Sequence, residues 1–206
     1  ARRSAAAVTG VCRAECGTVA GRRVLVLDTP GFGDAAQSVQ EICAEIRRGV
    51  AELVPPGALV SQLLIFSLQS RVGEDDFAVI EAVEGQVFGP RMLASTSIVW
   101  THADALDGQS LEDYLQGAGE RVQELLAKVG GGSVAVDNRQ QLAEGASLPQ
   151  VEDLLRRAEA VACKCPLVRL RAPRTYGRRT ARRQRQIEAG LLKQRPVREP
   201  GSCSVS

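Results

Sequence analysis

Aromatic residues are scarce in this sequence of 206 residues, at 3% of the chain against 44% for hydrophobic residues as a whole. A core must therefore be built from Val, Leu, Ile and Ala, a composition that suits a buried parallel sheet with flanking helices better than an aromatic-rich sandwich. No apolar run approaches the roughly 18–20 residues that span a bilayer, and no signal-peptide pattern is visible.

Metal-binding residues are also few. The chain has one histidine, His102, and six cysteines, none of which forms a C-x-x-C pair. A zinc site needs four clustered ligands, so this pattern argues against one. The cysteines are expected to be free thiols of a reducing compartment, which favours a cytoplasmic protein.

Charge is divided unevenly along the chain. Residues 164–206 hold twelve of the 26 Lys and Arg residues but only two of the 24 Asp and Glu residues, giving +10 there and −8 over residues 1–163. We predict a folded domain over 1–163 and a disordered basic tail over 164–206. The tail either meets an anionic surface, such as a membrane on which the protein is peripheral, or is a solvated arm. Nucleic-acid binding by the tail is the weaker alternative.

Apolar strand-like runs alternate with amphipathic helical stretches. The strands are expected at 23–27, 58–68, 95–100 and 133–136, with a further pairing strand near 18–19, and the helices at 37–53, 74–88, 111–129 and 150–163. Strands separated by helices of this length require crossover connections and a mainly parallel sheet. The predicted fold class is α/β, with one mainly parallel sheet and flanking helices.

Polar residues follow three of these strands, at the sheet edge where α/β proteins bind ligands. Asp28 ends an apolar strand and is a candidate for holding Mg²⁺, while Gly31 offers a backbone N–H to a terminal phosphate. Taken alone, Asp28-Thr29-Pro30-Gly31 is equally consistent with an ordinary strand-to-turn junction.

The other two polar groups suit a purine base. The carboxylate of Asp104 can accept hydrogen bonds from guanine N1–H and its exocyclic amine, a pair of donors that adenine lacks. His102, after Thr101, can flank the base with its ring, and Asn138 can contact it from the opposite side. A structural histidine and a simple turn at 137–138 are the alternatives.

Several motifs in this order resemble the immune-associated nucleotide-binding (GIMAP) family of septin-like GTPases over about residues 8–163. The matching segments are V-T-x-x-C at 8–12, V-L-V-L-D-T-P-G at 24–31, L-Q-S-R-V-G-E-D at 68–75, W-T-H-A-D at 100–104 and A-V-D-N-R at 135–139. The resemblance implies a P-loop GTPase-like fold that binds GTP or GDP with Mg²⁺. It assigns Mg²⁺ to Thr9 and Asp28, and the nucleotide to Gly31, Thr101, His102, Asp104 and Asn138.

Two departures from the family stand out. The phosphate-binding loop G-x-x-x-x-G-K-[ST] does not occur in the 206 residues, and Asp137 replaces an asparagine. Either the loop lies upstream and the domain is amino-terminally incomplete here, which we favour, or the domain is degenerate. The function expected is a nucleotide-dependent switch or assembly factor that associates with itself through the G domain. A nucleotide-free scaffold for a protein or membrane is the alternative. No glutamine or arginine stands out as catalytic, so hydrolysis is expected to be slow if it occurs.

The last four residues, C-S-V-S from Cys203, fit a prenylation box with serine last, although Ser204 is a poor aliphatic. The basic run before it would supply the second signal that stable membrane anchoring needs. The alternative is an unmodified thiol.

Overall fold

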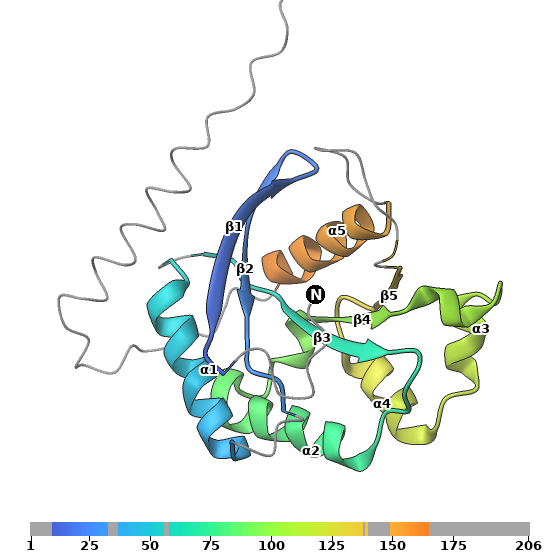
Figure 1. The fold of residues 1–206 in the computed structure, drawn as a ribbon, viewed down its shortest axis with the longest axis horizontal. Coiled ribbons are helices and arrows are strands. Elements are labelled where there is room, and N and C mark those ends of the chain that lie inside the picture. The colour runs from blue at the N-terminus through green and yellow to red at the C-terminus, as the bar shows by residue number, and fades with distance from the viewer. Residues whose placement is uncertain (1–9, 33–36, 56–57, 138, 140–148, 165–206) are drawn as a thin grey trace, which may run out of the picture.

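The computed structural model describes residues 10–32, 37–55, 58–137, 139 and 149–164. In chain order the elements are β1 (Arg13–Val19), β2 (Arg22–Asp28), α1 (Val39–Leu53), β3 (Gln62–Ser67), α2 (Glu74–Val83), the π-helical turn η1 (Glu84–Phe88), the 3-10 turn η2 (Leu93–Ser95), β4 (Thr96–Thr101), the 3-10 turn η3 (Ala103–Leu106), α3 (Leu111–Gln116), α4 (Glu120–Lys128), β5 (Ser133–Val136) and α5 (Pro149–Lys164). Figure 1 shows the β1–β2 hairpin rising beside α5, with α1 and α2 below it.

The strands form two sheets. β3, β4 and β5 are parallel in that order, whereas β1 and β2 make a separate antiparallel pair joined by a tight turn at Ala20 and Gly21, both with positive φ. The parallel sheet with flanking helices confirms the predicted fold class. The expectation that all the strands share one sheet is wrong for the described residues, because β2 pairs only with β1 there.

Helix α1 follows the local signals of the sequence closely. Ser38 caps it, since its hydroxyl accepts from the Glu41 N–H at 3.3 Å while the Glu41 carboxylate accepts from the Ser38 N–H at 2.8 Å. The predicted apolar stripe is buried, at Ile42, Ile46, Val50 and Leu53. The cap therefore sets where this helix begins, and the buried stripe sets which face it turns to the core.

The helix expected over 111–129 is wrong as a single element. Gly117 and Gly119 separate α3 from α4, because glycine gains little from helical geometry and loses the most backbone freedom there. The inner stripe nevertheless survives the break, since Leu115 and Leu125 are both buried in the core.

One apolar cluster lies on a single face of both sheets. It includes α1, α2 and η1, and Leu27 of β2 and Phe66 of β3 pack against it. On the other face, Val99 of β4 packs with Val134 and Val136 of β5 and with Leu154 of α5. Helix α5 thus packs on the second face at β4 and β5, and it lies beside the β1–β2 hairpin (Figure 1).

On β2 and β3, several apolar side chains are exposed to solvent. Val26 and Ile65 are each 58% exposed, and Leu63 is also exposed. The run of apolar residues at 23–27 predicted a strand covered on both faces, and within the described residues β2 has cover on only one. Each of these two strands also keeps one edge on which no described strand is paired.

Candidate functional site

The carboxyl ends of the three parallel strands lie side by side. Ser67 of β3 is level with Thr101 of β4, which is level with Val136 of β5. The loops that follow β4 and β5 therefore leave the sheet at one edge, as the sequence predicted for residues 101–104 and for Asp137. This edge is the candidate site.

His102 sits at that edge in the left-handed backbone region, with φ 60 and ψ 49. Its ring Nδ1 lies 3.2 Å from the Ser67 hydroxyl and 3.1 Å from the Thr101 hydroxyl, which itself donates to the Phe66 carbonyl at 3.1 Å. A histidine is tolerated in this backbone region more readily than most residues. The ring is exposed, and hydroxyls from two strands set its position.

Asp104 lies on η3, two residues further on, with its side chain 23% exposed. Its Oδ2 forms an ion pair with Nη1 of Arg139, with 3.2 Å between the two atoms. Its Oδ1 is buried and has no hydrogen-bond partner among the described residues. A buried carboxylate oxygen without a donor is costly to leave unpaired, so this group fits a ligand that brings N–H donors, as guanine does.

Arg139 connects the two loops. Its backbone N–H donates to Asp137 Oδ1 at 2.9 Å, and its Nε and Nη2 donate to Asp137 Oδ1 and Oδ2 at 3.2 and 3.3 Å. These side-chain hydrogen bonds hold the pKa of Asp137 below its ordinary value, and the nearby His102 acts in the same direction. The guanidinium thus joins Asp137 to Asp104 across the edge of the sheet.

Sequence reasoning missed the role of Arg139. The sequence placed Arg139 in the A-V-D-N-R motif but indicated no role for its side chain. The signal that pointed to it was Asp137, a carboxylate where the resembling family has an asparagine, because a carboxylate attracts a neighbouring arginine and an amide does so far less.

The segment at 68–75 also reaches this edge. The Leu68 N–H donates to the Thr101 carbonyl at 3.0 Å, which joins the end of β3 to the end of β4. The segment then enters α2, where the Gly73 N–H donates to Asp76 Oδ2 at 2.8 Å. This motif therefore has a structural role in setting the rim on which His102 stands.

Asp28 is the last residue of β2, in the two-stranded sheet, and Gly31 follows that strand. A side chain at Gly31 would meet open space, so packing does not require glycine there and a close-approaching ligand has room. The structure brings residues 101–104 together with Asp137 and Arg139. That Asp28 and Gly31 lie beside these residues remains a prediction.

Thr9, Asn138, Cys203 and the tail over 165–206 lie outside the described residues. Within the part that the structure describes, no three His, Cys, Asp or Glu side chains gather as a metal site would require. None of the described helices has both the length and the apolar character needed to cross a membrane.

The fold and the polar sheet edge define the class of protein as α/β GTPase-like. The solved structure of a dimerization-deficient mutant of Toc33 from Arabidopsis thaliana matches with a TM-score of 0.54 and 20% identity, over 81% of this chain and 75% of that one. This likeness shows the fold. The model of the AIG1 family matches residues 1–166, and the chain belongs to that family.

Named relatives fit this assignment. Immune-associated nucleotide-binding protein 13 of Arabidopsis thaliana is 31% identical over 145 residues, which is 70% of this chain and 42% of the relative. GTPase IMAP family member 8 of Mus musculus is 32% identical over 127 residues, 60% of this chain and 17% of the relative. The chain therefore spans less than half the length of the curated relatives it matches.

Proposed function

We propose that this chain binds guanine nucleotides, and that the edge formed by the loops after β4 and β5 recognises the base. The observation that carries the proposal is the Asp104 carboxylate, with one oxygen paired to Arg139 and the other buried without a donor. Guanine N1–H and its exocyclic amine supply two parallel donors, whereas adenine has no N1–H. His102 supplies a ring beside the base, and Asn138 is proposed to contact its other side.

The phosphate side is proposed to lie at the end of β2. Asp28 would hold Mg²⁺ with Thr9, and Gly31 would offer its N–H to the terminal phosphate. A magnesium ion bound there would neutralise phosphate charge. The glycine-rich loop that cradles phosphates in such sites is not among the 206 residues. Strands β2 and β3 each have an edge on which no described strand is paired, so a strand that carried such a loop would have a place to pair. It would also cover the exposed side chains of Val26 and Ile65.

The test is a titration of the chain with fluorescent GDP in the presence of Mg²⁺. Saturable binding that GTP displaces, that ADP does not displace, and that Asp104→Ala abolishes supports the proposal. The same titration with a variant to which a glycine-rich phosphate-binding loop is added upstream measures what such a loop contributes. If neither protein binds GDP up to millimolar concentration, guanine-nucleotide binding is rejected.

The second candidate function is a nucleotide-free scaffold for a protein partner, and the exposed apolar residues of β2 and β3 favour it. Unpaired strand edges next to apolar side chains accept an added strand from another chain. The titration above separates the two candidates, because a nucleotide-free scaffold predicts no detectable GDP binding.

Switching and self-association belong to this proposal. The Toc33 structure named above is of a dimerization-deficient mutant, so we include a homo-oligomer formed through the G domain. Light scattering of the chain with GDP, with GTP and without nucleotide tests it, and a mass that is the same in all three states rejects nucleotide-dependent assembly. Any hydrolysis is proposed to be slow.

The basic tail and Cys203 give the membrane part of the proposal, in which the protein binds peripherally to an anionic surface. Co-sedimentation with vesicles of mixed phosphatidylserine and phosphatidylcholine tests it. Loss of binding on deletion of residues 165–206 supports the proposal, and equal binding by both chains contradicts it.

A further inference from the structure

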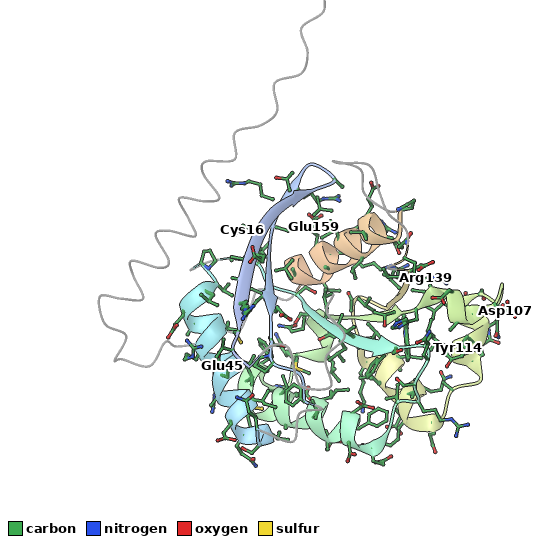
Figure 2. The ribbon with its side chains drawn as sticks, viewed as in Figure 1. Cys16, Glu45, Asp107, Tyr114, Arg139 and Glu159 are labelled. Atoms are coloured by element: carbon green, nitrogen blue, oxygen red, sulfur yellow. The ribbon has the colours of Figure 1, made fainter. Side chains whose placement is uncertain are left out.

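Arg139 holds the carboxylate that the proposed function assigns to guanine. Its guanidinium is 67% exposed, while the two carboxylates it joins are largely buried, at 23% exposed for Asp104 and 18% for Asp137. The arginine is therefore the most solvent-exposed of the three side chains. Figure 2 labels it on the edge of the parallel sheet.

The chemistry of this contact matches that of the base. A guanidinium presents coplanar N–H donors to a carboxylate, and guanine presents its N1–H and exocyclic amine in the same way. A guanine edge needs both oxygens of Asp104, of which Oδ2 is already ion-paired with Nη1 of Arg139 at 3.2 Å. The arginine and the base thus compete for the same acceptor.

From this arrangement, and resting on the proposed function, we infer that Arg139 is an affinity-determining residue that guanine must displace from Asp104. Displacement is local. Arg139 has a single contact with Asp104 but three hydrogen bonds to Asp137, so it releases the first while it stays tied to the second. Asp137 thereby keeps the displaced charge beside the site.

The expected effect is modest, because an exposed ion pair contributes little to stability. Replacement by an uncharged side chain of similar length, Arg139→Met, frees Asp104 and is expected to tighten fluorescent GDP binding by about two- to fivefold. ADP binding is expected to stay unchanged, since adenine makes no use of the freed oxygen. In the double variant Arg139→Met, Asp104→Ala the gain disappears, because the residue that was freed is gone.

Arg156 provides the matched control. It is an arginine of α5 with 69% of its side chain exposed, and it is paired to Asp153 three residues earlier in the same helix. Arg156→Met removes the same charge and leaves GDP affinity unchanged. A gain equal to that of Arg139→Met would show a general charge effect and overturn the inference.

A second readout is independent of nucleotide. Because Arg139 lowers the pKa of Asp137, Arg139→Met is expected to raise that pKa toward its ordinary value in a carboxyl NMR titration. An unchanged pKa means that the bridge is not formed, and the inference fails whatever GDP does. Weaker or unchanged GDP binding by Arg139→Met also overturns it, while the proposed function stands on the wild-type titration. If neither protein binds GDP, both fail.

Discussion

Gly49 of α1 packs directly against Cys12, which lies just before β1. A methyl group at Gly49 would lie 2.5 Å from Cys12 Cβ and 2.6 Å from its Sγ, well inside contact distance. The same pair of segments is tied by the Cys12 N–H, which donates to Glu45 Oε1 at 2.7 Å. Helix α1 therefore packs against the segment before β1 at a distance that only a glycine at position 49 allows.

Gly49→Ala is expected to destabilise the fold by about 1–3 kcal/mol, because the added methyl group overpacks a rigid contact. Alanine favours a helix over glycine by only about 1 kcal/mol, which is too little to reverse the sign. Urea unfolding measures the change. Gly85→Ala is the control, since its added methyl group meets open space, and that variant is expected to be as stable as the wild type or more so. Equal effects from both variants would contradict the packing argument.

The thiol of Cys12 is expected to be inert. Burial, together with the nearby Glu45 carboxylate, raises its pKa to about 11. At pH 8 roughly one thiol in a thousand is then ionised, and the thiolate is the reactive form. Peptide mapping after iodoacetamide treatment of the native protein should show slow labelling of Cys12, and fast labelling only after unfolding. Labelling of Cys12 at the rate of a free peptide thiol contradicts this.

Acid should weaken the fold through carboxylates held by arginine. The Arg157 hydrogen bond keeps the pKa of Asp153 below its ordinary value. A lowered folded-state pKa adds stability above the unfolded value of about 3.9, and that stability is lost as the pH falls through the folded value. Asp153→Asn should therefore be less stable than the wild type at pH 7, and the two should converge as the pH falls below about 4. Arg157→Met should reproduce the same curve, and a gap that persists at low pH contradicts the assignment.

Substitution of two neighbouring apolar residues on β3 should change the stability of the fold by different amounts. Leu64 packs against the main core, whereas Ile65 is 58% exposed. Leu64→Ala is expected to destabilise the chain by about 2 kcal/mol, and Ile65→Thr, which keeps the branched side chain, by less than about 0.5 kcal/mol. If a strand added upstream of the chain covers this face, Ile65→Thr should become costly in that extended protein. Equal effects in both proteins would show that nothing further packs on β3.

Helices and strands could be predicted from the sequence where the local signals and the burial agree. The stripe from Ile42 to Leu53 and the strand at 133–136 were both recognisable, because periodicity and flanking turn residues pointed the same way. The polar edge at Thr101–Asp104 was predictable, since parallel strands end together. The break at Gly117 was missed because the apolar period continues across it.

The separation of β2 from the parallel sheet could not be predicted from sequence. An apolar run such as 23–27 indicates a buried strand but does not say which neighbour pairs with it. The bridge from Arg139 to Asp104 was equally hidden, because it depends on how two loops far apart in sequence meet. Local patterns carry no information on such pairings.

The central claim is that Asp104 recognises guanine, and Asp104→Asn tests it most directly. An asparagine amide accepts from N1–H and donates to a 2-oxo group, so it matches xanthine in place of guanine. We predict that the variant loses about 10- to 100-fold in affinity for fluorescent GDP, as expected for a buried mismatched donor, and binds xanthosine diphosphate more tightly than the wild type does. Unchanged GDP affinity in the variant, with no gain for xanthosine diphosphate, would contradict the account.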